Sequence, residues 1–180
     1  HLDCSLNRLN GLPKKIGLIT NLIHFFCNNQ LKEIPTEMSI EMPTAIPKEI
    51  GLLANLTYLD CSHNNLTELS KEIGLLTNLT HLYCNNKKLT ELPKEIGLLV
   101  NLTILICSYN NLIKLPIELI NLRRLYIFDK SNNPIEYIPP NVVRFLDNIN
   151  NYNRNGNGIY SDSQSVHNHT IQEGIQKSIS

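Results

Sequence analysis

Apolar residues return along this chain at a fixed interval, and most of them occupy the same places in a 23-residue unit. Three units, which begin at Leu56, Leu79 and Leu102, align without a gap. The fixed places of the first unit are held by Leu56, Leu59, Cys61, Asn64, Leu66, Leu69, Ile73, Gly74 and Leu76. Partial units precede and follow these three. Because one such unit cannot bury its own apolar face, the pattern predicts a stack of about five coils.

Each unit has the features of a strand, a turn and a second, different segment. Alternation across Leu59, Asp60 and Cys61 predicts a strand whose every second side chain points inward. An asparagine such as Asn64 then turns the chain, since its amide can both donate to and accept from neighbouring backbone. Prolines follow at a place where no ladder N–H is needed, namely Pro13, Pro47, Pro93, Pro116 and Pro139.

The pattern L-x-x-L-x-C/L-x-x-N-x-L-x-x-L-P-x-x-I-G-x-L-x-N resembles the leucine-rich-repeat family over about residues 1–146. Its LPKEIG and NLTxL segments are similar to the intracellular 23-residue class of Ras-associated scaffold proteins. The Asn- and Ile-rich composition and the tail also resemble leucine-rich-repeat proteins of amoeba-infecting giant DNA viruses. The resemblance implies an α/β solenoid, with a parallel sheet on the concave face and short helical or extended convex segments.

The repeat is irregular over residues 28–46. The five cysteines lie 23, 34, 23 and 23 residues apart, so one interval is too long. Ile34–Met38 and Ile46–Ile50 look like two copies of one convex segment with no strand between them. We interpret residues 35–46 as a repeat that lost its strand and expect it to loop out or kink the solenoid. Lys87 stands where the turn asparagine belongs, so this turn should open or rearrange.

The solenoid is predicted to end at Leu146. Residues 147–165 have a linker composition rich in Asn, Gly and Ser, and residues 148–157 alone hold six asparagines. Ile171, Ile175 and Ile179 then recur at every fourth residue, and a Thr170–Glu173 capping box begins this pattern. Together they predict a short amphipathic helix within residues 166–180. This helix is either a cap or tail element or a docking helix for a partner.

Composition narrows the class of function. Sixteen basic and sixteen acidic residues cancel, which removes the electrostatic footprint of a nucleic-acid binder. No apolar run approaches the roughly 20 residues that span a bilayer, and no signal-peptide pattern opens the chain. His1 falls in the middle of a repeat, so we expect the chain to be part of a longer protein. We therefore expect neither a nucleic acid nor a membrane as partner.

The cysteines, sequon asparagines and histidines could suggest a metal site, glycosylation or catalysis, but their positions follow from the repeat. Aligned cysteines would form a row at about 4.8 Å spacing, which cannot supply the four converging ligands of zinc and suits a disulfide poorly. Sequons such as Asn78-Leu-Thr follow from the repeated N-L-x step. His24 and His81 share one column but are separated by Tyr58. We therefore expect no catalytic residue, metal or cofactor, and core thiols in a reducing, cytoplasmic compartment (that of the host cell, if the protein is viral).

The predicted concave face carries the candidate partner-binding residues. Aromatic, histidine and aliphatic side chains gather there on an otherwise polar surface, which is typical of an interaction site. The residues are His24, Phe26, Tyr58, His63, His81, Tyr83, Ile104, Ile106 and Tyr109. The alternative is that these side chains stack on one another only to stabilise the sheet.

The repeat pattern and the residues of this face together predict a protein–protein interaction module that binds a partner through the concave face. One alternative is the substrate-recognition arm of a larger enzyme, such as a ubiquitin ligase, kinase or GTPase, whose catalytic part lies outside this chain. Another is a structural role, such as a virion component that assembles with itself.

Overall fold

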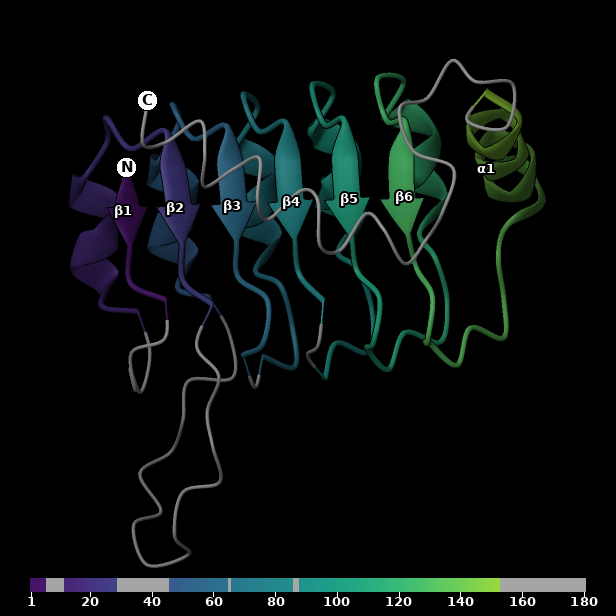
Figure 1. The fold of residues 1–180 in the computed structure, drawn as a ribbon, viewed down its shortest axis with the longest axis horizontal. Coiled ribbons are helices and arrows are strands. Elements are labelled where there is room, and N and C mark those ends of the chain that lie inside the picture. The colour runs from purple at the N-terminus through teal and green to yellow at the C-terminus, as the bar shows by residue number, and fades with distance from the viewer. Residues whose placement is uncertain (6–11, 29–45, 65, 86–87, 153–180) are drawn as a thin grey trace, which may run out of the picture.

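A computed structural model describes residues 1–5, 12–28, 46–64, 66–85 and 88–152. Within them, short strands alternate with 3-10 helices along the chain, and one α-helix follows (Figure 1). The strands are β1 (Leu2–Asp3), β2 (His24–Phe26), β3 (Tyr58–Asp60), β4 (His81–Tyr83), β5 (Ile104–Ile106) and β6 (Ile127–Asp129). The 3-10 helices are η1 (Lys14–Leu18), η2 (Lys48–Leu52), η3 (Lys71–Leu75), η4 (Lys94–Leu98) and η5 (Ile117–Asn121). The α-helix is α1 (Pro140–Tyr152).

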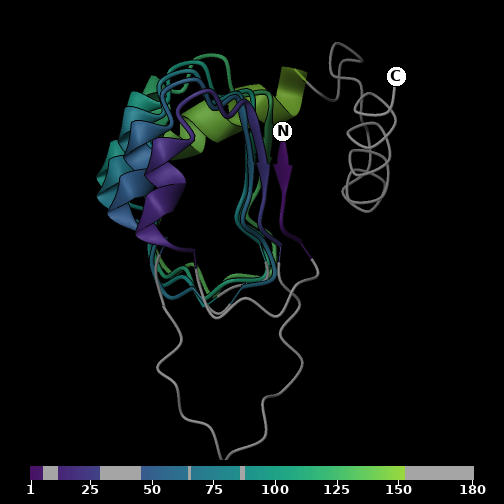
Figure 2. The same ribbon diagram turned by 90° about the vertical axis from the view of Figure 1, so that its left-hand side faces the viewer.

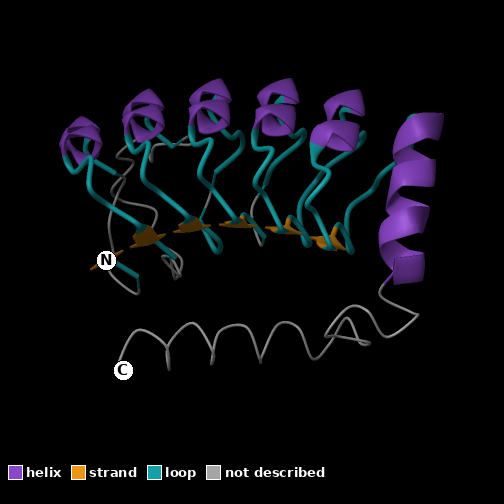
Figure 3. Cartoon of the chain, turned by 90° about the horizontal axis from the view of Figure 1, so that it is seen from above, coloured by secondary structure: helices purple, strands orange, loops and turns teal. Residues whose placement is uncertain are grey.

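The six strands form one parallel sheet in the order β1-β2-β3-β4-β5-β6. Each turn of the chain adds one strand on one side and one 3-10 helix on the other, as the view along the stack shows (Figure 2). Seen from above, the helices fan out more widely than the strands, so the sheet lines the inner curve (Figure 3). The α/β solenoid with a concave parallel sheet is confirmed.

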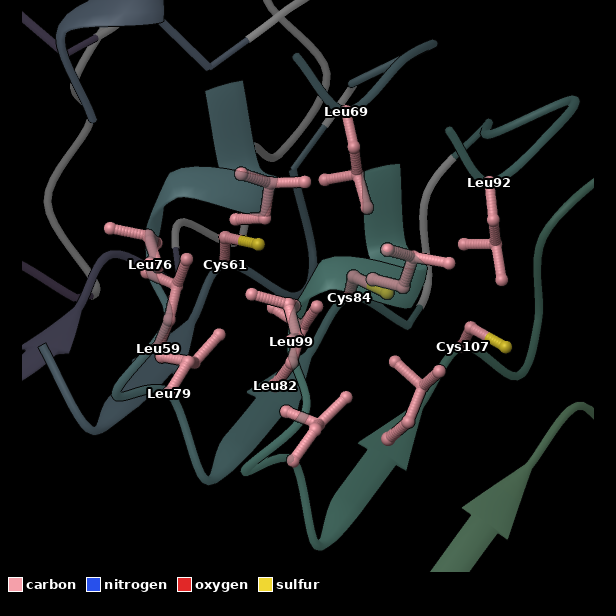
Figure 4. Packing of buried hydrophobic residues seen from close by; sticks show 14 of the residues in the cluster. Leu59, Cys61, Leu69, Leu76, Leu79, Leu82, Cys84, Leu92, Leu99 and Cys107 are labelled. Atoms are coloured by element: carbon pink, nitrogen blue, oxygen red, sulfur yellow. The ribbon is translucent and has the colours of Figure 1, made fainter. Parts of the chain in front are cut away.

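The core lies between the sheet and the 3-10 helices. The middle residue of each central strand points into it, so Phe25, Leu59 and Leu82 have no exposed surface. Cys61, Cys84 and Cys107 form a row of fully buried thiols among leucine side chains (Figure 4). Burial raises the pKa of the Cys107 thiol well above its ordinary value, so this thiol stays protonated and unreactive at neutral pH. All five cysteines lie among the described residues, and none of them forms a disulfide.

The glycine in each K-E-I-G-L segment is required because neighbouring coils approach closely there. A Cβ on Gly51 would lie 2.9 Å from a methyl carbon of Leu75 and 3.0 Å from the carbonyl oxygen of Glu72. In the same way, a Cβ on Gly17 would crowd a methyl carbon of Leu52, and a Cβ on Gly74 would crowd one of Leu98. The half-exposed leucines on the convex side therefore have a packing role, each against the glycine of the preceding coil.

A ladder of asparagines joins the turns that follow the strands. Asn110 donates from Nδ2 to the carbonyl oxygens of Cys84 and Cys107, both at 2.9 Å, and accepts from the Leu89 N–H at 3.2 Å. Asn64 and Asn133 repeat these contacts in other coils. Lys87, which holds the equivalent place in the sequence, lies outside the described residues. Its predicted effect on the turn stays a prediction, but an ammonium group has no acceptor for an N–H.

The sheet continues without interruption across the long interval between cysteines. β2 pairs directly with β3, and His24, Phe25 and Phe26 lie opposite Tyr58, Leu59 and Asp60. Of the predicted strandless segment 35–46, only Ile46 is among the described residues, and it is buried in the core. The interval therefore changes neither the pairing nor the register of the described strands.

The helix α1 continues past Leu146, the predicted end of the solenoid, to Tyr152. Val142, Leu146 and Ile149 lie on one face of α1, are buried, and cover the last coil. Asn141, Asn148 and Asn150 are exposed on α1, so up to residue 150 the asparagine-rich composition that predicted a linker belongs to the polar face of a helix. The rest of the predicted linker and the predicted helix over 166–180 lie outside the described residues.

Candidate binding surface

The strands place two columns of side chains on the open, concave side of the sheet. One column runs from His24 through Tyr58, His81 and Ile104 to Ile127, because these residues lie opposite one another in register. The second column contains Phe26, Asp60, Tyr83, Ile106 and Asp129. Alternation along a strand explains both columns, since the residue between them points into the core. The predicted sharing of one face by these residues is correct.

The side chains of β2 to β4 form one cluster of rings, which we call the aromatic patch (His24, Phe26, Tyr58, His81 and Tyr83). Tyr58 lies at its centre: its ring centroid is 4.9 Å from that of Phe26 and 5.2 Å from that of Tyr83. The same ring stacks on His81 at 5.6 Å and meets the edge of His24 at 6.0 Å. Such offset and edge contacts favour a preformed, rigid surface. All five side chains are half-buried.

The remaining predicted residues differ in exposure. Ile104 and Ile106 are only 4% exposed, so they extend the apolar character of the aromatic patch but offer little surface of their own. His63 and Tyr109 lie in the turns after β3 and β5 and have positive φ angles of 53° and 55°. Tyr109 is 56% exposed. The structure therefore joins seven of the nine predicted residues in one face and places His63 and Tyr109 at its edge.

Burial keeps the ionisable groups of the aromatic patch uncharged. It lowers the pKa of His81, and the nearby His24 lowers it further. The pKa of His24 is lowered mainly by burial and then by the positive N-terminus. Burial also raises the pKa of Tyr58 far above its ordinary value. At neutral pH the rings of the aromatic patch are therefore uncharged and suited to apolar and aromatic groups, while the acidic side chain of Asp60 lies in the same column between Phe26 and Tyr83.

The described residues contain no group of three His, Cys, Asp or Glu side chains placed to hold a metal ion. His24 and His81 lie on strands separated by β3, with the ring of Tyr58 between them. Among the described helices, none is both long and apolar enough to cross a membrane.

A polar hollow of about 600 Å³, which the sequence pattern did not predict, lies at the amino ends of the strands. Asparagines and threonines of the repeated N-L-T step line it, together with Arg124. Their side chains already bond to the preceding coil: Asn55, Asn78 and Asn101 each donate to a backbone carbonyl at 2.9–3.0 Å. These bonds give the sequon asparagines a structural role. The hollow is therefore explained by the contacts that hold the coils together.

Comparison with known proteins supports the repeat. Residues 54–95 match a family model described as "Leucine Rich repeats (2 copies)". A search of curated proteins gave no significant match. A leucine-rich-repeat protein of Leptospira interrogans is 32% identical over 76% of this chain, with a TM-score of 0.59. The plant peptide hormone receptor RGFR1, solved in complex with RGF2, is 27% identical over 78% of this chain, with a TM-score of 0.63.

An internalin from Listeria monocytogenes shares the fold at 23% identity over 69% of this chain and 32% of its own length, with a TM-score of 0.54. This chain spans 38% of the Leptospira protein and 22% of the plant receptor chain. The matched repeats, the parallel stack of coils and these similarities together identify the chain as a leucine-rich-repeat protein.

Proposed function

We propose that the chain is a protein-binding module whose partner binds the concave face over the aromatic patch. Proteins with leucine-rich repeats are generally non-enzymatic protein–protein interaction modules. The observation that carries the finer proposal is the cluster of uncharged rings centred on Tyr58, which is preformed on the open side of the sheet. Tyrosine side chains of this kind are enriched among the residues that dominate binding energy.

Tyr109 adds an independent argument. A bulky side chain at a positive φ is an outlier, because its Cβ crowds the backbone in the left-handed region. Asn132 holds the corresponding place in the next coil at nearly the same φ, 54°, and asparagine tolerates this conformation well. Neither packing nor backbone geometry explains an exposed tyrosine at this turn. A strained residue that the fold does not require supports a role in binding.

The class of partner follows from the surface. Concave curvature and a cluster of uncharged rings suit a folded or extended polypeptide that inserts aromatic or aliphatic side chains, with polar contacts from Asp60 within the patch and from Asp129 on the last strand. The similar plant receptor was solved with the peptide hormone RGF2, which is a precedent for a peptide ligand on this fold. We place the interaction in the reducing cytoplasm, a proposal supported by the presence of five cysteines that form no disulfide.

Replacing Tyr58 and Tyr83 together by alanine is expected to weaken the partner roughly 30-fold or more, the effect of losing one strong anchor of about 2 kcal/mol. The two rings form the centre of the aromatic patch, 5.2 Å apart. Affinity capture with the unmodified chain would first identify the partner, and calorimetry would then compare the dissociation constants.

Tyr137→Ala is the matched control for this experiment. Tyr137 is 59% exposed and lies in the isolated bridge with Lys114, outside both concave columns. It is expected to leave the affinity unchanged. Equal affinities for the unmodified chain and the double variant, with both chains folded by circular dichroism, would show that the partner binds elsewhere.

Tyr109→Asn is expected to separate stability from binding. The change should raise the free energy of unfolding by up to about 1 kcal/mol, because asparagine relieves the strain at positive φ. It should also weaken the partner, because the exposed ring is lost. Urea denaturation and calorimetry measure the two effects. A more stable variant that binds as tightly as the unmodified chain would remove Tyr109 from the binding surface.

The substrate-recognition arm of a larger ubiquitin ligase, kinase or GTPase is the alternative proposal. It uses the same face, so the open reading frame around these residues distinguishes it: a catalytic domain on the same polypeptide would favour it.

A further inference from the structure

We propose that residues 166–180 of this chain bind the aromatic patch in cis and compete there with the partner. This inference rests on the proposed function of the concave face and adds its regulation. Three observations carry it: the apolar pattern of this segment, the chemistry of the face, and the place where the described chain ends.

The segment needs an apolar surface to fold against. Its sequence, VHNHTIQEGIQKSIS, spaces Ile171, Ile175 and Ile179 at every fourth residue, so a helix would carry all three on one side. Glu173 and Lys177 would occupy the opposite side. A helix of this length that contains a glycine is marginal in water by itself. The isoleucine stripe stabilises it only when another apolar surface covers that stripe.

The aromatic patch offers such a surface. Its rings are uncharged because the histidines within it have lowered pKa values and the tyrosine at its centre has a raised one. Ile104 and Ile106 continue it toward the C-terminal end of the sheet. The segment has one acidic and one basic residue, so it brings no net charge to a surface on which Asp60 lies between Phe26 and Tyr83. The isoleucine stripe and the rings therefore match in being apolar.

The C-terminal end of α1 lies on the same side of the molecule as the sheet that carries the aromatic patch. α1 lies across the last coil and ends at Tyr152 on the side where the strands lie (Figure 3). The thirteen residues 153–165 can span about 45 Å when extended. Neighbouring strands lie about 4.8 Å apart, so β3 is within about 15 Å of β6 along the sheet. The connection therefore reaches the whole patch with slack.

Because the segment and the patch belong to the same chain, even weak contacts between them are sufficient for the segment to occupy the patch. A short flexible connection holds a segment at an effective concentration of about a millimolar. A partner must then displace the segment, and its apparent affinity falls accordingly. The convex row of exposed leucines is the other apolar surface, but Leu52, Leu75 and Leu98 already pack against glycines. They belong to the 3-10 helices, which lie on the far side of the sheet from the end of α1 (Figure 3).

Photo-crosslinking in the full chain tests the proposal without any partner. Benzoylphenylalanine would replace Ile175 in one variant and Glu173 in the control variant, which places the probe on the opposite side of the same segment. Mass spectrometry would locate the crosslinks. We expect intrachain crosslinks from position 175 to peptides that contain β3, β4 or β5, at a yield at least about fivefold above the control.

Three results would overturn the proposal: crosslinks between two chains, which would identify a second copy as the occupant; intrachain crosslinks mainly to η2–η4; or equal yields from both positions. Tyr83→Ala in the crosslinking chain should lower the yield at least about fivefold, while Tyr137→Ala should not. Because no partner is present, failure here leaves the proposed function standing. Success here combined with unchanged partner binding by Tyr58→Ala/Tyr83→Ala would instead refute the proposed function.

Discussion

Replacing Leu82 by alanine is expected to lower the free energy of unfolding by about 3–5 kcal/mol. Leu82 is the middle residue of β4, has no exposed surface, and lies in the core between Leu59 and Leu105 of the adjacent strands. The loss combines the transfer free energy of the removed methyl groups with that of a cavity that a stacked sheet cannot close by relaxing. Since whole domains are stable by about 5–15 kcal/mol, this is a large fraction of the total.

Leu18→Ala is the control for the same chemical change. Leu18 is 76% exposed on η1, so its loss should change the free energy of unfolding by less than about 0.5 kcal/mol. Urea denaturation followed by far-ultraviolet circular dichroism would compare both variants with the unmodified chain, at equal slope of free energy against urea. A similar, small effect in both variants would contradict the assignment of the strand's inner face.

Replacing Asn110 by alanine is expected to destabilise the chain by about 2–4 kcal/mol, although the change removes no apolar group. Asn110 is 5% exposed and serves two coils at once. Its Nδ2 donates to the carbonyls of Cys84 and Cys107, and its Oδ1 accepts from Leu89. Alanine leaves each of these backbone groups without that partner, where water does not readily replace it.

Asn78→Ala separates the effect of burial from that of the lost hydrogen bond. Asn78 also donates to a carbonyl of the preceding coil, that of Ala54 at 2.9 Å, but its side chain is exposed. Water can take its place, so the expected loss is below about 1 kcal/mol. Thermal and urea unfolding of both variants would measure the difference. If Asn110→Ala were as mild as Asn78→Ala, the asparagine ladder would not hold the coils together.

The spacing of the residues was sufficient to predict the solenoid and its register. Once the cysteines define a period, residues such as Tyr58 and His81 must lie opposite one another, because each coil repeats the previous one. The inward column of Leu59, Leu82 and Leu105 follows from alternation. The parallel sheet and the membership of the repeat family are confirmed, while the binding role of the concave face stays a proposal.

Two features were not predicted in this way. The helix α1 was missed, although Pro140 at its start and Val142, Leu146 and Ile149 at helical spacing were a usable signal. Composition suggested a linker because asparagine dominates the polar positions. The second is the uneven exposure of the candidate site: Ile104 is buried, whereas Tyr109 is open to solvent at a strained turn.

The sequence by itself determined the repeat, the strand faces and the row of buried thiols, because periodic spacing and polarity act locally and recur in every coil. Only the tertiary structure decided that the rings of β2, β3 and β4 meet around Tyr58 and that α1 covers the last coil. These depend on the curvature of the stack and on contacts between distant segments. Side-chain exposure and ring geometry are properties of the packed neighbours, which a linear pattern does not contain.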